Sequence, residues 1–348
     1  MRPDPQRHET GGAGGFVATT ETVPPAIVNP DTGAKTGVGS ATAETRNADT
    51  RYVAIGYVFA ILGIVTFSSK SIFIKLAYAE GIGAEALLAL RMILALPFYL
   101  GIGALSLRDR RRAGTGLPSP VLFVKAVLIG VLGYWVASYL DFLSLQRITA
   151  QYNVLILLTY PLFVVLFGAL FFRQPVQRRA VIAFALAYVG VAVIFTGKLA
   201  TLGSDIITGT GLVLAASVAF AFYMLFARDV IGQMGPRLFT CVTMIAMSTA
   251  AIVQFLLVAP VSALHTTPTG YGTVLLLAII ATVLPTFLMN AALQRITAQA
   301  NATVGMAAPV MTIVMAAVVL GETMTVRDML GAALVIGSVG WFTIGGRR

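Results

Sequence analysis

The sequence predicts an all-α, polytopic membrane protein in which ten transmembrane helices form two inverted five-helix repeats. Three observations predict this fold class. The 348-residue chain is 57% hydrophobic and only 11% charged, a composition that an ordinary soluble domain of this length does not have. Its apolar residues gather in ten long segments, and a heptapeptide that links two of these segments recurs unchanged between two others.

Ten segments are long enough to cross the ~30 Å hydrocarbon core of a bilayer, which takes about 20 apolar residues in a helix. In chain order they are residues 52–76, 85–106, 121–144, 150–172, 179–197, 208–228, 236–258, 271–293, 299–320 and 327–345. Most of the links between them are short, so we expect consecutive helices to be antiparallel neighbours. The first five make up a repeat over residues 52–197, and the last five a repeat over residues 208–346.

The heptapeptide Leu-Gln-Arg-Ile-Thr-Ala-Gln begins at Leu145 and again at Leu293. The same register aligns four further pairs: Asn153 with Asn301, Pro161 with Pro309, Arg179 with Arg327 and Gly197 with Gly345. The first copy joins spans three and four and the second joins spans eight and nine, so each repeat holds five helices. Because five is an odd number, the repeats must be inverted across the membrane. This arrangement is typical of transporters and places a substrate site near the midplane, where the two halves meet.

Basic residues predict the orientation. With the N-terminus inside, the inner segments carry fourteen arginines, among them the cluster Arg108 to Arg112, whereas the outer loops carry only Arg147, Lys198 and Arg327. Cytoplasmic loops carry an excess of Lys and Arg, so both termini are predicted to be cytoplasmic. The formal net charge of +10 is spread over the ends of apolar segments rather than over one patch, which argues against a nucleic-acid partner.

Residues 1–51 differ in kind from the rest of the chain. They are rich in Gly, Thr, Ala and Pro and contain no apolar stretch, so we expect a disordered cytoplasmic tail. A single cysteine and two histidines provide neither a disulfide framework nor a metal site, and we expect no bound cofactor. No GxxxxGK[ST] motif is present, which argues against ATP-driven pumping by this chain.

Several motifs resemble those of a known family. Leu90-Arg91-Met92 in span two, Pro309 in span nine, and the sequences Leu320-Gly321-Glu322 and Gly331-Ala332-Ala333-Leu334 are similar to motifs of the EamA-type permeases of the drug/metabolite transporter superfamily. The resemblance covers residues 52–346. The first half departs from it where Arg173-Gln174-Pro175 replaces the Gly-Glu turn. The resemblance implies a secondary transporter of the bacterial inner membrane that moves small metabolites such as amino acids, with export more frequent than uptake.

Ionisable residues inside predicted spans are candidates for function, because a charge at the centre of a membrane helix costs about 2.5–3.5 kcal/mol on insertion scales. Lys70 in span one, Arg91 in span two and Asp141 in span three lie at a similar depth, one to two turns from the outer ends of their spans. We expect them to form a buried network of net charge near +1 that binds the carboxylate of an anionic or zwitterionic substrate. The alternative is a structural pair between Arg91 and Asp141 that holds the first half together.

Polar and aromatic residues at helical spacing suggest further substrate contacts. On span three Tyr134 and Ser138 share a face with Asp141, span six offers Tyr223, span eight offers Asn290, and Tyr160 precedes the proline of span four. Hydrogen bonding between helices explains such polar stripes equally well.

Pro161 and Pro309 occupy equivalent positions in spans four and nine. Proline removes a backbone hydrogen bond and bends a helix, so this pair is predicted to form hinges for a rocking motion between the halves. Two static kinks that shape the bundle remain the alternative.

Two other functions remain open at this stage. A membrane-embedded sensor has no feature against it except the lack of a folded cytoplasmic domain, and an intramembrane enzyme finds support only in the four-residue spacing of Ser71 and Lys75. The predicted partners are a small-molecule substrate and the lipid bilayer. Small residues in span ten, such as Gly331 and Gly337, permit close helix contact and a possible homodimer, although packing within one chain is the default.

Overall fold

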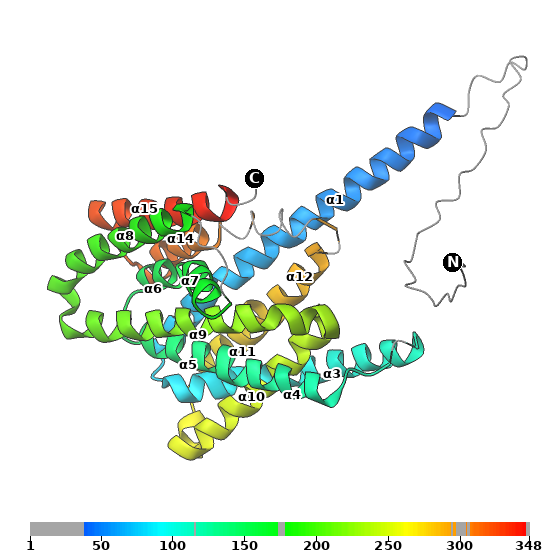
Figure 1. The fold of residues 1–348 in the computed structure, drawn as a ribbon. Helices are drawn as coiled ribbons and strands as arrows, with labels where there is room; N and C mark the ends of the chain where they lie inside the picture. The colour runs from blue at the N-terminus through cyan, green and yellow to red at the C-terminus, as the bar shows by residue number, and fades with distance from the viewer. Residues whose placement is uncertain are drawn as a thin grey trace, which may run out of the picture. The chain divides into compact units, whose positions relative to one another are not determined.

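The computed structural model describes the backbone of residues 38–114, 116–172, 178–293, 295–296, 304 and 307–345, without the side chains of 38–50, 172, 200–202, 228, 290, 293 and 342–345. The chain divides into two units, Met1–Ala48 and Asp49–Arg348. All contacts below lie within the second unit. The described residues form helices and no strand (Figure 1).

The first half contains spans one to five, built from nine helical segments. They are α1 (Val38–Ser68), α2 (Lys70–Ala79), α3 (Ala84–Arg112), α4 (Pro120–Leu128), the π-helical segment η1 (Ile129–Trp135), α5 (Val136–Leu145), α6 (Ala150–Leu157), α7 (Tyr160–Phe172) and, as the fifth span, α8 (Arg178–Leu202). Helix α1 begins at Val38, before the predicted start at residue 52. Residues 38–51 contain no proline, so nothing stops the helix from continuing outward from its apolar part. Residues 1–37 of the predicted tail lie outside the described residues.

The second half repeats this order. Its segments are α9 (Ser204–Met234), α10 (Pro236–Val258), the short 3₁₀ turn η2 (Val261–Leu264), α11 (Pro268–Ala278), the π-helical segment η3 (Ile279–Val283), α12 (Leu284–Leu293), α14 (Ala308–Leu320) and α15 (Val326–Gly345). Among the described residues, eight helical stretches, from Arg51–Ala79 to Pro268–Met289, are long and apolar enough to cross a membrane. The ninth predicted span is represented by the shorter apolar helix α14, and the tenth by α15. The all-α polytopic fold is therefore confirmed.

The two copies of the heptapeptide have the same structural role, which the sequence did not reveal. In the first copy, Ile148 packs against Gly209 of α9, where an added Cβ would lie 2.5 Å from the Ile148 Cγ2. In the second copy, Ile296 packs against Gly56 of α1, where a Cβ would lie 2.7 Å from the Ile296 Cγ2. Each turn thus holds the first span of the other half at a distance that only glycine permits.

The arginine of each turn also contacts the first span of the opposite half. Arg147 forms an exposed ion pair with Asp205 of α9 at 3.0 Å, and the Arg295 guanidinium lies 5.2 Å from the ring centre of Tyr52 and 5.0 Å from that of Phe59 in α1. The repeat is therefore a pair of equivalent contacts between halves.

Several spans are interrupted near their middle. Span four breaks at Leu158 and Thr159, just before Pro161, and α14 begins at Ala308, directly before Pro309. Pro161 thus directly follows the interruption of span four, and Pro309 is the second residue of α14. Most of residues 297–306 lie outside the described residues, and a hinge role for the two prolines stays a prediction. Span one also breaks at Ser69, between α1 and α2, without a proline.

Spans three and eight contain the two π-helical segments, and these occupy equivalent places in the two halves. Segment η1 ends at Trp135 and η3 ends at Val283, a separation of 283 − 135 = 148 residues, which is the register of the repeat. Single π-helical turns are rare and occur frequently at functional sites. Both predicted halves therefore carry a local widening of the helix at the same level.

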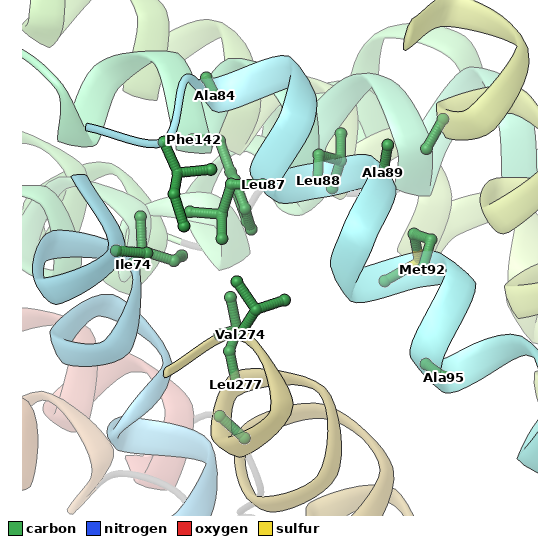
Figure 2. Packing of buried hydrophobic residues seen from close by; sticks show 14 of the residues in the cluster. Ile74, Ala84, Leu87, Leu88, Ala89, Met92, Ala95, Phe142, Val274 and Leu277 are labelled. Carbon is green, nitrogen blue, oxygen red and sulfur yellow. The ribbon is translucent and has the colours of Figure 1, made fainter. Parts of the chain in front are cut away.

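A large buried cluster joins the two halves beside the predicted site. Figure 2 shows side chains of α2, α3 and α11 converging with Phe142 of α5, among them Ile74, Leu87 and Leu277. The Phe142 side chain is fully buried. Its packing fixes the position of α5, and with it the neighbouring residue Asp141.

Candidate functional site

Lys70 and Asp141 form a direct ion pair. The Lys70 Nζ donates a hydrogen bond of 2.7 Å to the Asp141 Oδ2, and the two side chains are 16% and 4% exposed. Lys70 is the first residue of α2, so the break at Ser69 sets the direction in which its side chain leaves span one. The sequence placed both residues at one depth, and the structure brings them together.

Asp141 has a second set of partners from the start of span four. Asn153 donates through its Nδ2 to the Asp141 Oδ1 at 3.0 Å and to the Ser144 Oγ at 2.7 Å. Ser144 in turn donates to the Asp141 backbone carbonyl at 2.7 Å. Within the described residues the Asn153 Oδ1 is buried without a hydrogen-bond partner. The carboxylate is thus satisfied, while an amide oxygen beside it is not.

Arg91 is the most deeply buried cation of the site. Its residue is 3% exposed, its Nε donates to the Thr282 Oγ1 at 2.9 Å, and its guanidinium carbon lies 5.3 Å from the centre of the Phe142 ring. The Nη1 atom has no hydrogen-bond partner among the described residues. The ion pair expected between Arg91 and Asp141 is not formed there, because Asp141 is held by Lys70 and Asn153.

Thr282 belongs to the π-helical segment η3, which explains how it reaches Arg91. Its hydroxyl donates to the Leu277 carbonyl five residues earlier at 2.8 Å, the spacing of a π-helical turn. The oxygen can still accept the hydrogen bond from Arg91. The π-helical segment η3 of the second half therefore positions Arg91 of the first half.

Three of the predicted aromatic contacts meet around Phe220 of α9. The ring centre of Phe220 lies 6.2 Å from that of Tyr134, 4.9 Å from that of Tyr160 and 5.6 Å from that of Tyr223. Tyr134 and Tyr223 are 5.2 Å apart. Spans three, four and six thus share an aromatic cluster, hereafter the Phe220 cluster, whose separations are those of stabilising ring pairs.

Two other predicted contacts are less informative. Ser138 is half-buried and makes no hydrogen bond to any described side chain or backbone group. Asn290 lies in α12, but its side chain is outside the described residues. The small residue Gly331 of span ten lies against Gly190 and Ile194 of α8, so at that position the close contact is within the chain.

Sequence reasoning missed the roles of Ser144 and Thr282 as direct partners of the charged residues. Asn153 is visible in the sequence as a repeated polar residue in the first turn of span four, and it bonds to Asp141 of the preceding helix α5. Thr149 caps α6, because its Oγ1 accepts a hydrogen bond of 3.3 Å from the Tyr152 backbone. The signal available for Thr282 was the polar stripe of span eight, where Thr282, Thr286 and Asn290 recur at helical spacing.

Comparison with known proteins agrees with this architecture. Residues 54–196 and 207–344 each match the EamA-like transporter family. The chain is 30% identical over 289 residues to the uncharacterized transporter YcbK of Bacillus subtilis (strain 168), which covers 81% of this chain and 90% of the relative. It is 28% identical over 228 residues to the threonine/homoserine exporter RhtA of Escherichia coli (strain K12), with 62% of this chain and 68% of the relative covered.

A solved crystal structure with 19% sequence identity superposes at a TM-score of 0.54, covering 86% of this chain and 97% of the other. That likeness concerns the fold alone. The family matches cover both halves of the helical bundle. The apolar helices of the bundle identify a multi-pass membrane protein. The chain therefore belongs to the EamA-like transporter family.

Proposed function

We propose that the chain is a secondary carrier that exports small amino acids or related carboxylates across the bacterial inner membrane by alternating access, with both termini in the cytoplasm. The observation that carries this proposal is the buried guanidinium of Arg91. Arginine keeps its charge in proteins, and a buried charge without a paired anion is costly. An anionic group of the substrate supplies the partner that Arg91 lacks.

The charge balance supports a carboxylate as that group. Lys70 and Asp141 neutralise each other at 2.7 Å, so the cluster retains the single positive charge of Arg91. The aromatic face of Phe142 offsets part of its desolvation, but it cannot replace a carboxylate. A guanidinium nitrogen hydrogen-bonded to a carboxylate forms one of the stronger contacts available in a protein.

The unpaired Oδ1 of Asn153 suggests that the substrate also carries an amino group. The Asn153 Oδ1 is a buried acceptor without a partner, and it adjoins the carboxylate of Asp141. A donor at Arg91 and an acceptor at Asn153 complement the two ends of a zwitterionic amino acid. The relative named as a threonine/homoserine exporter makes threonine the first amino acid to test and export the first direction.

The inverted five-helix repeats and the interrupted spans support alternating access. Breaks at Ser69 and before Pro161 give span one and span four two segments each, and substrate sites of inverted-repeat carriers are typically formed by such discontinuous helices. Pro161 and Pro309 are the proposed hinges. The Phe220 cluster would then contact the substrate side chain.

The experiment compares amino acids inside and outside cells that express the wild type, Arg91→Gln, Arg108→Gln or an empty vector. Arg108 is exposed at the end of α3, so Arg108→Gln is the matched control. Wild type and control should lower the cellular content of threonine or another small amino acid. Arg91→Gln should require a roughly 10- to 100-fold higher internal concentration for the same flux, as expected for the loss of a charged hydrogen bond.

Competition then identifies the group that Arg91 binds. Threonine should compete with the transported amino acid in the wild type, whereas threonine amide, which lacks the carboxylate, should not. An Arg91→Gln variant at full membrane abundance with unchanged affinity would keep the carrier and refute the site. No redistribution by the wild type, across the whole set of amino and carboxylic acids, would refute the proposed substrate class.

A further inference from the structure

Glu322 connects the end of span nine to the start of span four. Its Oε1 accepts a hydrogen bond of 2.8 Å from the Ala150 backbone, its Oε2 accepts one of 3.1 Å from the Gln151 backbone, and the Gln151 Nε2 donates back to the Glu322 carbonyl at 3.0 Å. Gly321, with φ of 65°, ends α14 in the left-handed conformation and turns Glu322 toward α6. We call these three hydrogen bonds the Glu322 latch.

The latch completes the N-terminus of α6. The first N–H groups of a helix have no partner within it; those of Ala150 and Gln151 bind Glu322, while that of Tyr152 binds the Thr149 side chain. Ala150 and Gln151 are buried, so without Glu322 their N–H groups need water. A carboxylate also interacts favourably with the positive end of the helix dipole. The latch is therefore a strong contact while it is dry, and it opens only when water enters.

The latch joins the two halves, because α6 belongs to the first and α14 to the second. It lies at the end of the bundle where spans three and four meet, which is the outer end in the proposed orientation. A carrier that works by alternating access must separate its halves at this end to release an exported substrate. Glu322 thus resists the step that opens the carrier outward.

The corresponding positions in the sequence of the other repeat differ in one residue. In the register of the repeat, Ala150 and Gln151 correspond to Ala298 and Gln299, but Glu322 corresponds to Gln174. These three residues lie outside the described part of the chain, so the comparison concerns sequence. An amide has one acceptor oxygen and no charge, and it cannot hold two backbone N–H groups as a carboxylate does.

We propose that Glu322 determines which side of the carrier is closed at rest: the carboxylate of Glu322, whose counterpart in the sequence of the other repeat is the amide Gln174, keeps the outer end shut and leaves the site facing the cytoplasm. This inference rests on the proposed alternating access. It assigns a role in the transport cycle to a residue that does not contact the charged cluster. An exporter needs this resting state, since its substrate arrives from the cytoplasm.

A cysteine placed under the latch reports its opening. In a Cys241→Ala background, Ala150→Cys keeps the backbone N–H that binds Glu322, and its side chain is fully buried. The rate of its alkylation by a membrane-impermeant maleimide, added outside intact cells, should be low. Glu322→Gln should raise this rate roughly tenfold or more, as expected for the loss of a charged hydrogen bond. Glu85→Gln, which removes a carboxylate whose partner Tyr139 belongs to the same half, should leave it unchanged.

The exchange of residues between the two ends separates a resting preference from simple loosening of α6. Gln174→Glu leaves the Glu322 latch intact, yet it should raise labelling from outside because it places a second carboxylate at the position that corresponds to Glu322 in the other repeat. The double variant Glu322→Gln/Gln174→Glu should label fastest. Equal rates in Gln174→Glu and wild type would overturn the inference, as would a Glu322→Gln rate within twofold of the parent.

The labelling needs no substrate, so its outcome is independent of the flux measurements. If the labelling rates change as expected but no amino acid is transported, the proposed substrate class is refuted and the role of Glu322 is supported. If amino acids are transported but the labelling rates do not change, the proposed function is supported and the role of Glu322 is refuted.

Discussion

The buried ion pair between Lys70 and Asp141 predicts strong coupling between two substitutions. The perturbation is a double-mutant cycle consisting of Lys70→Met, Asp141→Asn and the variant with both changes. Methionine keeps much of the length of lysine, and asparagine keeps the shape of aspartate. Each single change therefore removes one charge while altering the packing little.

Removing one member of a buried pair costs about 3–5 kcal/mol, since the other charge is left uncompensated. Lys70→Met leaves Asp141, a side chain only 4% exposed, with the neutral amide of Asn153 as its remaining side-chain partner. Asp141→Asn leaves Lys70, whose side chain is 16% exposed and can be partly hydrated. We therefore expect Lys70→Met to lie at the upper end of that range and Asp141→Asn at the lower end.

The double variant should recover most of this loss. Replacing both partners of a buried pair by uncharged groups is often neutral or stabilising, so we expect it to lie within about 1 kcal/mol of the wild type. Two single costs of at least about 3 kcal/mol each and a double cost of at most about 1 kcal/mol give a coupling free energy of about 5 kcal/mol or more. A surface pair gives the contrast: Arg237 and Asp109, at 3.1 Å with side chains 51% and 59% exposed, should couple by less than about 1 kcal/mol.

The assay is denaturant-induced unfolding in detergent micelles, followed by tryptophan fluorescence. The chain has two tryptophans: Trp135, whose indole stacks on Tyr139 in the first half, and Trp341 in α15. Single-tryptophan variants report the two halves separately. If the cost of the double variant equals the sum of the single costs within about 0.5 kcal/mol, the ion pair does not stabilise the fold, and the reasoning is wrong.

Two further substitutions test the contacts between the halves. Gly209→Leu should destabilise the folded protein by about 1–3 kcal/mol, because a Cβ at this position would lie 2.5 Å from the Ile148 Cγ2. Gly211→Leu is the control: a Cβ there would meet nothing within 4 Å, so the midpoint of unfolding should change little. Thr282→Val should cost about 1–3 kcal/mol by leaving the Nε of Arg91 without an acceptor and should weaken substrate affinity, whereas Thr282→Ser should restore both. Unfolding midpoints and substrate competition measure these effects, and a fully stable Gly209→Leu protein or a Thr282→Val protein with normal affinity would contradict them.

The spans were predictable because length and apolar composition determine what crosses a bilayer. Span seven was predicted at residues 236–258 and α10 is Pro236–Val258, since Pro236 begins the helix and Pro260 follows it. The interruption at Ser69 and the π-helical segments were not predictable. All these residues lie in apolar runs, and a local change of helical register leaves the composition of the run unchanged.

The charged residues of the candidate site were predictable from their cost in a membrane, but their pairing was not. Both Arg91 and Lys70 had the depth and charge to bind Asp141. Which of the two cations binds Asp141 depends on how each helix is rotated relative to α5. The break at Ser69 turns Lys70 toward Asp141, whereas the hydrogen bond to Thr282 holds Arg91 away from it. A sequence gives the depth of a residue along a helix far better than it gives the rotation of that helix about its axis.

The two halves have equivalent helices and turns, but their charged residues differ. The turns at Ile148 and Ile296 have the same sequence and contact the opposing glycines in the same way, as the proposed rocking of one half against the other requires. The charge of Asp141 has no counterpart, since the equivalent residue in the second half is Met289. A second carboxylate at that level would have required a second cation in the membrane, at a further cost of a few kcal/mol. The second half instead contributes a neutral hydroxyl, that of Thr282, which orients Arg91 without adding charge.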